Sequence, residues 1–195
     1  MTGKGSVLAP VLRSETQARL LAAVLLHPDR EASIADLARE TGSDPGNLHS
    51  EVERLAQAGI IADRRAGRTR LLRPGDSALI GPLANLLVLG YGPKPAVENA
   101  LSDIPDIEQA FLGGSWAARY HGQPGTFPHD VDVIMVGKPD RDDATKAVVE
   151  ALWAIGHDGQ VIFRSTPAWR EAKDAFNRTA KNGPLVELQI GNDDA

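Results

Sequence analysis

The sequence predicts a protein of the α/β class, more specifically α+β, which folds as two parts. Residues 1–75 carry three helical patterns and then a basic hairpin, whereas residues 94–195 alternate apolar strand patterns with helices. The intervening residues 76–93 are strongly apolar and predict a linker helix. Because helical and period-two patterns alternate in the second part, we expect a mixed sheet with helices packed against it.

The composition excludes several classes of protein. The chain has 195 residues, of which 42% are hydrophobic and 24% charged, as in ordinary globular proteins. The absence of cysteine excludes disulfides, thiolate metal sites and cysteine nucleophiles. No run of 18 apolar residues occurs, so we expect no membrane partner. The first ten residues lack a long hydrophobic segment, so we expect no secretory signal and a cytoplasmic protein.

The net charge of −5 conceals an uneven distribution of charge along the chain. Residues 1–74 contain 11 Lys and Arg against 9 Asp and Glu, whereas residues 75–195 contain 10 against 17. The overall acidity therefore does not argue against a nucleic-acid partner, because the basic residues are concentrated in the N-terminal part.

The N-terminal part has three helix start signals in succession. Ser14 begins a capping-box pattern before the first apolar stripe. Ser33 is the expected N-cap of a short second helix. Asp44 followed by Pro45 predicts the start of a third helix. The third helix carries its expected buried residues on one face: Leu48, Val52 and Leu55.

A basic hairpin follows the third helix. Two short strand patterns flank a turn that contains Gly67, and four arginines lie in seven residues around it, Arg64, Arg65, Arg68 and Arg70. A charged hairpin on its own is often only a solvated surface. Here no acidic residue follows Asp63 within the hairpin, which favours a polyanion as partner.

Taken together, residues 14–73 resemble the winged helix of ArsR- and MarR-like bacterial repressors. The resemblance implies that double-stranded DNA is a partner, with a recognition helix at 44–58 in the major groove and a wing at 64–70 on the backbone or minor groove. A winged helix that binds another protein is the alternative interpretation. The DNA-binding residues that we predict are Asn47, His49, Ser50, Arg54, Arg64, Arg65, Arg68 and Arg70.

The apolar segment from Ser77 to Leu89 reads as a helix with Pro82 near its start. Such a helix can pack against a second subunit, which predicts a homodimer, since winged-helix repressors usually bind two half-sites. Packing between the two parts of one chain is the alternative.

The C-terminal part contains the most informative motif. An apolar strand at 107–112 runs into Gly114-Ser115, and the next apolar strand opens with Asp130 and Asp132. Because strand side chains alternate, the two aspartates point the same way and can share one divalent cation, for which Mg²⁺ is the natural candidate. Gly114 permits close approach to a phosphate, and Ser115 can cap the helix that follows.

Gly-Ser followed by Asp-x-Asp on the next strand resembles the nucleotidyltransferase superfamily related to DNA polymerase beta, over residues 94–190. The resemblance implies Mg²⁺ at Asp130 and Asp132, which are also the catalytic candidates, and an NTP held by Gly114, Ser115 and Arg119. We expect its elements in this order: helix 94–101, strand 107–112, helix 115–120, strand 131–136, turn 138–143, helix 144–155, strand 160–164, helix 167–176 and strand 185–190.

The sequence departs from the active enzymes of that superfamily in one respect. These carry a third carboxylate on the next core strand, and the strand at 160–164 has none. Glu187, on the last predicted strand, is a candidate to replace it. His129 also stands where a serine commonly precedes the first aspartate.

Three functions follow from these patterns. The first is a transcriptional regulator whose second part senses a Mg²⁺-nucleotide or holds a dimer. The second is an enzyme that transfers a nucleotidyl group from an NTP to a protein, an RNA or a small-molecule hydroxyl. The third is an antitoxin-like component of a toxin–antitoxin pair, since small nucleotidyltransferases of this kind can occur in such pairs.

Overall fold

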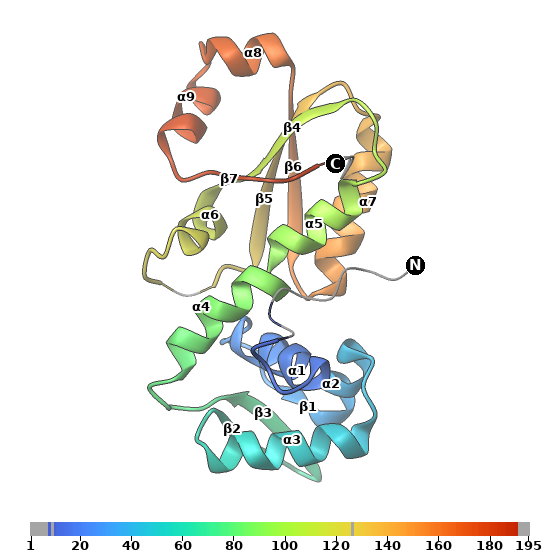
Figure 1. The fold of residues 1–195 in the computed structure, drawn as a ribbon, viewed down its shortest axis with the longest axis vertical. Helices are drawn as coiled ribbons and strands as arrows, with labels where there is room; N and C mark the ends of the chain where they lie inside the picture. The colour runs from blue at the N-terminus through green and yellow to red at the C-terminus, as the bar shows by residue number, and fades with distance from the viewer. Residues whose placement is uncertain (1–7, 9, 126, 191–195) are drawn as a thin grey trace. The chain divides into compact units, whose positions relative to one another are not determined.

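The computed structural model describes residues 8, 10–125 and 127–190. The chain divides into two compact units, residues 1–92 and residues 93–195, and each is described by itself (Figure 1). Most of the first ten residues, for which we expect no secretory signal, lie outside the described residues. The predicted fold class is confirmed, because a helical unit with a small antiparallel sheet precedes a unit with a mixed sheet.

The N-terminal unit is built from three helices, a three-stranded sheet and a fourth helix. The sheet has the order β1-β3-β2 and is antiparallel throughout. Figure 1 shows this unit in blue to green. Its elements are α1 (Glu15–Leu25), β1 (Ala32–Ser33), α2 (Ile34–Thr41), α3 (Pro45–Gln57), β2 (Ile61–Ala66), β3 (Thr69–Pro74) and α4 (Ile80–Tyr91).

The capping residues that the sequence predicts begin these helices. The Ser33 hydroxyl accepts from the backbone N–H of Asp36, whose carboxylate accepts from the backbone N–H of Ser33, which completes a capping box. At α1 the capping box is only half present. Ser14 accepts from the N–H of Gln17, but the Gln17 side chain accepts from Arg13 rather than from Ser14.

Leucines from every helix fill the core of the N-terminal unit. The side chains that are almost completely buried are Leu20, Leu25, Leu37, Leu48, Ile61, Leu72 and Leu87. Helix α4 begins at Ile80, three residues later than predicted, because the Ser77 side chain and carbonyl accept from the N–H groups of Leu79 and Ile80 in a turn. Helix α4 packs against α1.

The C-terminal unit is a four-stranded mixed sheet with helices on both faces. The strand order is β6-β5-β4-β7, with β5 and β6 parallel and the other pairs antiparallel. Its elements are α5 (Pro93–Leu101), β4 (Ile107–Leu112), α6 (Gly114–Tyr120), β5 (Asp130–Gly137), α7 (Arg141–Ala154), β6 (Asp158–Arg164), α8 (Thr166–Glu171), α9 (Ala175–Asn182) and β7 (Val186–Glu187).

Alternating residues of β5 and β6 face different helices. A side chain at Gly159 would meet Leu152 of α7, so this face of the sheet lies against α7. On the other face, Ile134 and Val136 pack with Trp169 of α8 and with Phe176 of α9. Asp130 and Asp132 lie on this second face as well. Side chains of a strand alternate between its two faces, and both aspartates are an even number of residues from Ile134.

Three predicted elements of this unit have different bounds. Helix α7 begins at Arg141 inside the predicted turn, because the Asp140 carboxylate accepts from the N–H groups of Asp142 and Asp143 (both 3.0 Å). The helix predicted at 167–176 is two helices, since Ala172 adopts a left-handed conformation at φ 47° and ends α8. The last strand is Val186–Glu187 only.

Candidate functional site

Helix α3 presents a polar face to solvent. The Asp44 carboxylate accepts from the N–H groups of Gly46 (2.9 Å) and Asn47 (3.1 Å) and fixes the start of the helix. Its apolar residues Leu48 and Val52 are completely buried. On the rest of the helix surface, Asn47, His49 and Ser50 are all exposed, so their side chains are accessible to a ligand.

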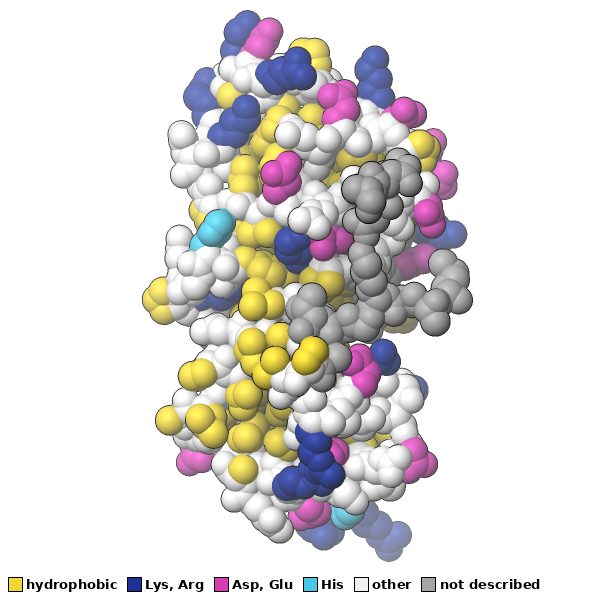
Figure 2. All heavy atoms as spheres, viewed as in Figure 1, with side chains coloured by type: hydrophobic (Ala, Val, Ile, Leu, Met, Phe, Trp, Pro, Cys, Tyr) yellow, Lys and Arg dark blue, Asp and Glu magenta, His cyan; other side chains and the backbone are white. Residues whose placement is uncertain are grey.

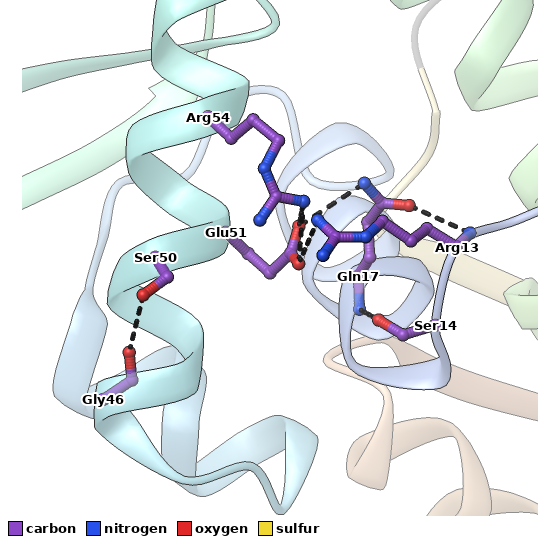
Figure 3. Close-up of polar contacts among 7 residues, drawn as sticks. All are labelled: Arg13, Ser14, Gln17, Gly46, Ser50, Glu51 and Arg54. Carbon is purple, nitrogen blue, oxygen red and sulfur yellow. Dashed lines mark hydrogen bonds and ion pairs between the residues drawn. The ribbon is translucent and has the colours of Figure 1, made fainter.

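Glu51 is a buried acid whose structural role the sequence analysis missed. It lies on the buried side of α3 with 8% of its surface exposed, and its carboxylate faces α1 (Figure 3). Arg54 donates to both carboxylate oxygens at 3.1 Å, and Arg13 and Gln17 each donate at 3.4 Å. An acid within the apolar stripe of α3, three residues before an arginine, was the available signal.

Arg54 therefore has a structural partner, although we predicted it as a DNA contact. Its guanidinium group is directed to Glu51 rather than outward with Asn47 and His49 (Figure 3). Ser50 also has an internal partner, since its hydroxyl donates to the Gly46 carbonyl at 3.4 Å. His49 lies near Glu53, with 3.7 Å between Nε2 and Oε1.

The predicted wing is the hairpin of β2 and β3, which turns at Gly67 with φ 61°. Two of its arginines are paired. Arg64 donates to both oxygens of Glu31 at 2.8 and 2.9 Å, and Arg70 bonds to Glu53 of α3 and to Asp63 of β2. Arg70 thus joins the hairpin to α3.

These pairs shift the pKa values of the groups involved. The hydrogen bond from Arg64 lowers the pKa of Glu31, and that from Arg70 lowers the pKa of Asp63. The same bonds raise the pKa of both guanidinium groups. The carboxylates are therefore held ionised at neutral pH.

The other two wing arginines, Arg65 and Arg68, are exposed. Neither forms an ion pair with any residue in the described part of the chain. The four predicted arginines therefore divide into Arg64 and Arg70, which brace the hairpin, and Arg65 and Arg68, which are exposed and form no ion pair with another described residue.

The C-terminal unit contains a cavity of about 550 Å³ at the end of β4. It is lined by the Gly-Ser motif, by β5 and β6, and by α9 and the segment that follows it. Asp132 and Gln160 are side by side there as register partners. The apolar lining residues are Ala118, Ile134, Ile162, Phe176, Ala180, Pro184 and Leu185.

The structure gives a steric reason for Gly114. Its φ is 60°, and a Cβ atom there would lie 2.6 Å from a carboxylate oxygen of Asp132. The N–H of Gly113 donates to the Asp132 carbonyl at 2.9 Å. The Gly-Ser motif and the second aspartate are therefore packed directly together, and the missing side chain at 114 leaves room for the carboxylate.

The other predicted residues of this region lie apart from the described lining of the cavity. Asp130 is exposed at the first position of β5. Arg119 is directed toward Gly125, and its buried Nε and Nη1 atoms have no hydrogen-bond partner among the residues that the structure describes. Glu187 is exposed on β7, which β4 separates from β5.

The donor set does not fit a two-metal centre. Gln160, an amide, stands beside Asp132 where a third carboxylate would be needed. An acid that we missed, Asp158, is the register partner of Asp130, but it lies 3.2 Å from His129 in an exposed pair. No group of three His, Asp or Glu in the described residues is arranged to hold a metal ion.

Residues 13–70 match the MarR family. This segment spans less than a third of the chain and lies within the N-terminal unit. The unit is a winged helix-turn-helix domain of the class found in DNA-binding transcriptional regulators. No curated protein sequence matches the chain. Among the described residues no helix is long and apolar enough to cross a membrane.

Solved structures of three other proteins are similar to the chain. HlyU from Vibrio cholerae, in its reduced form, is 21% identical, with 42% of this chain and 82% of that chain covered and a TM-score of 0.35. The antimony-specific transcriptional repressor AntR is 31% identical, with 43% and 73% covered and a TM-score of 0.34. ZitR from Lactococcus lactis in complex with DNA is 18% identical, with 53% and 68% covered and a TM-score of 0.37.

None of these matches supports the nucleotidyltransferase resemblance of residues 94–190. The assignments of Mg²⁺, of an NTP and of catalysis to this part of the chain stay predictions.

Proposed function

We propose that this chain regulates transcription by inserting α3 into the major groove of double-stranded DNA while the β2–β3 hairpin contacts the flanking backbone. The observation that carries the proposal is the combination of an exposed polar face on α3 with two exposed arginines on the hairpin, in a domain of which residues 13–70 match the MarR family. Contacts to base edges in the groove give sequence specificity, and contacts to the DNA backbone give affinity.

The side chains divide by role in this proposal. Asn47, His49 and Ser50 are the groups that read base edges, because amide, imidazole and hydroxyl groups can each donate and accept hydrogen bonds there. Arg65 and Arg68 bind phosphates. The braced arginines and Arg54 act indirectly, since they hold the hairpin and α3 in position.

The proposal includes a homodimer that forms through α4. Two large apolar residues are exposed there: Leu79 at the N-cap of α4 and Leu89 within it, at 57% and 54%. Figure 2 shows hydrophobic side chains gathered on the surface of the N-terminal unit where α4 lies in Figure 1. Two copies joined in this way would present two recognition helices to two half-sites.

The direct test is fluorescence anisotropy of the full chain on DNA from upstream of its own gene, over a series of salt concentrations, with unrelated DNA as control. The log of the association constant should fall linearly with the log of salt concentration. Replacing Arg65 and Arg68 by Ala should reduce the slope by about 1 per lost phosphate contact.

The matched control replaces Arg65 and Arg68 by Lys, which keeps the charges and should keep the slope. Absence of selective binding by the wild-type chain, or an unchanged slope in the double Ala variant, would contradict the proposal.

Nucleotidyl transfer is the second candidate function, and the juxtaposition of the Gly-Ser motif with Asp132 is the observation in its favour. An assay with a labelled NTP tests it, and transfer that is lost in Asp130→Asn would support it. The antitoxin interpretation is tested by whether a protein encoded by a neighbouring gene co-purifies with the chain.

A further inference from the structure

Asp132 occupies an unusual position in the C-terminal unit. It is half-buried, and its carboxylate lies against Gly114 at the wall of the cavity. Among the described residues it has no side-chain hydrogen bond and no ion pair. The carboxylate oxygens are not among the buried unpartnered polar atoms of the described residues, so they are open to the cavity and accessible to a ligand of opposite charge.

Asp132 is also the only charged side chain among the described residues that line the cavity. The neighbouring polar groups are neutral: the Gln160 amide and the hydroxyls of Ser115 and Thr179. The cavity therefore has one negative charge and no compensating cation on its described walls. A ligand with several negative charges would be repelled unless it brought its own cations.

A divalent metal ion held by the protein alone is a poor fit to this cavity. Mg²⁺ takes six oxygen ligands and Ca²⁺ six to eight, so a site with one carboxylate would need waters or ligand phosphates to complete the shell. The register partner of Asp132 is an amide, and Asp130 is exposed and apart from the described lining. A single carboxylate instead suits an organic cation with one positive charge, which it can bind through one charge-assisted hydrogen bond.

The rest of the cavity suits the hydrocarbon part of such a cation. Ile134, Ile162, Phe176 and Leu185 provide apolar walls, and the volume of about 550 Å³ lies in the range of pockets for small organic ligands. A molecule with an apolar body would bury this body against them while its charged end met Asp132.

From these observations we propose that the cavity of the C-terminal unit binds a small organic cation, an amine with an aromatic or aliphatic body, whose ammonium group is held by Asp132. The body lies against Ile162 and Phe176, and Gln160 and Ser115 accept further ammonium hydrogens. This site concerns the C-terminal unit alone and does not depend on DNA binding, but it supplies the class of effector that the proposed regulator would sense.

The test measures binding to the full chain in the absence of DNA, so its failure is distinct from a failure of the DNA proposal. Isothermal titration compares arylalkyl amines, with 2-phenylethylamine and tryptamine as probes, against 2-phenylethanol and tryptophol, which have the same carbon skeletons and a hydroxyl in place of the ammonium group. The amines should bind and raise the Tm, and the alcohols should bind at least about tenfold more weakly, as expected for loss of a charged hydrogen bond.

Asp132→Asn should weaken amine binding by about tenfold or more, whereas the matched control Glu150→Gln, an exposed acid on α7 against the other face of the sheet, should leave it unchanged. Because a cavity variant can fail to fold, Ile162→Trp, on the strand paired with that of Asp132, provides a second test. It should abolish binding by filling the cavity and leave the carboxylate in place.

Three outcomes of the amine titrations would overturn the proposal. They are equal binding of amines and alcohols, no binding of any amine tested, and amine binding that survives both Asp132→Asn and Ile162→Trp. Stabilisation by Mg²⁺-ATP that is lost in both Asp130→Asn and Asp132→Asn would also overturn it, and would return the cavity to the metal–nucleotide interpretation.

Discussion

Glu51 determines how α3 is held against α1. Its carboxylate accepts hydrogen bonds from Arg54 on its own helix and from Arg13 and Gln17 at the start of α1. Because all three donors converge on one buried acid, the rotation of α3 about its axis is constrained at this point. The exposed residues on the opposite side of α3 are thereby oriented without touching α1 themselves.

Replacing Glu51 by Ala should lower the free energy of unfolding by about 1–3 kcal/mol, because three donors lose a charged acceptor. Glu51→Gln should cost less, since an amide oxygen still accepts one bond. Urea unfolding measures both. Gln57→Ala, an exposed site on the same helix, is the control and should change stability by less than about 0.5 kcal/mol. A Glu51→Ala effect no larger than that of the control would contradict this role.

Gly114 gives a second prediction at the level of single residues. Gly114→Ala should destabilise the chain by about 1–2 kcal/mol for its positive φ alone, and by more because the new Cβ meets the Asp132 carboxylate. In an Asp132→Ala background the steric part should disappear, so the same substitution should cost less there. Equal costs in the two backgrounds, measured by chemical unfolding, would show that Asp132 is not the reason for this glycine.

At the level of elements, ion pairs hold the hairpin to the rest of the N-terminal unit. Glu31 and Asp63 have ordinary pKa values of 4.5 and 3.8, and both are lowered in the folded state by arginines of the hairpin. A lowered carboxyl pKa means that the unfolded chain binds protons first as the pH falls. The stabilisation is therefore complete above pH 4.5 and is lost as the pH falls through the lowered values.

The midpoint of urea unfolding should accordingly fall on acidification below pH 4.5. A Glu31→Gln, Asp63→Asn double variant should show a shallower fall, because two of the shifted groups are gone. Chemical shifts of the carboxyl carbons report the two pKa values directly. Unshifted values for Glu31 and Asp63 would contradict these ion pairs.

The bounds of the elements show what local sequence can and cannot predict. Ser33 and Asp44 were recognisable as N-caps because a cap acts on N–H groups two or three residues away, within the same segment. The break at Ala172 was not recognisable, because alanine has no local preference for a left-handed conformation. The pattern that predicted one helix at 167–176 therefore missed a tertiary constraint.

The residues of the candidate sites also differ in whether the local sequence predicts their environment. Exposure of Asn47 and His49 followed from helical periodicity, which depends on spacing alone. Which arginines are free did not follow, because the partner Glu31 lies 33 residues before Arg64 and Glu53 lies 17 before Arg70. Pairings at such separations depend on how strands and helices are brought together, which no local pattern contains.

At the scale of the whole molecule, the uneven charge of the sequence matches the different ligands that we propose for the two units. The N-terminal unit has exposed arginines on its hairpin, which suit a polyanion. The cavity of the C-terminal unit has an uncompensated carboxylate, which suits a cation. The acidic net charge of the chain is therefore compatible with DNA binding, since the charges that matter lie in separate units.

The apolar outer face of α4 predicts the assembly state of the whole molecule. Ala84, Leu87 and Val88 are buried in the unit that contains α1, whereas Leu79 and Leu89 are more than half exposed. Burying two such leucines from each copy stabilises a dimer by removing apolar surface from water. Light scattering after size exclusion should therefore give twice the chain mass of 20.8 kDa.

Leu89→Glu should convert this dimer to a monomer with an unchanged far-UV circular dichroism spectrum, because the residue is not part of the core. It should also weaken DNA binding, since one copy contacts only one half-site. Trp153→Glu is the matched control: Trp153 is 78% exposed on α7 of the other unit, and its replacement should leave the dimer intact. A wild-type monomer would show that α4 is not a subunit interface, and a dimer lost only in Trp153→Glu would place that interface on α7.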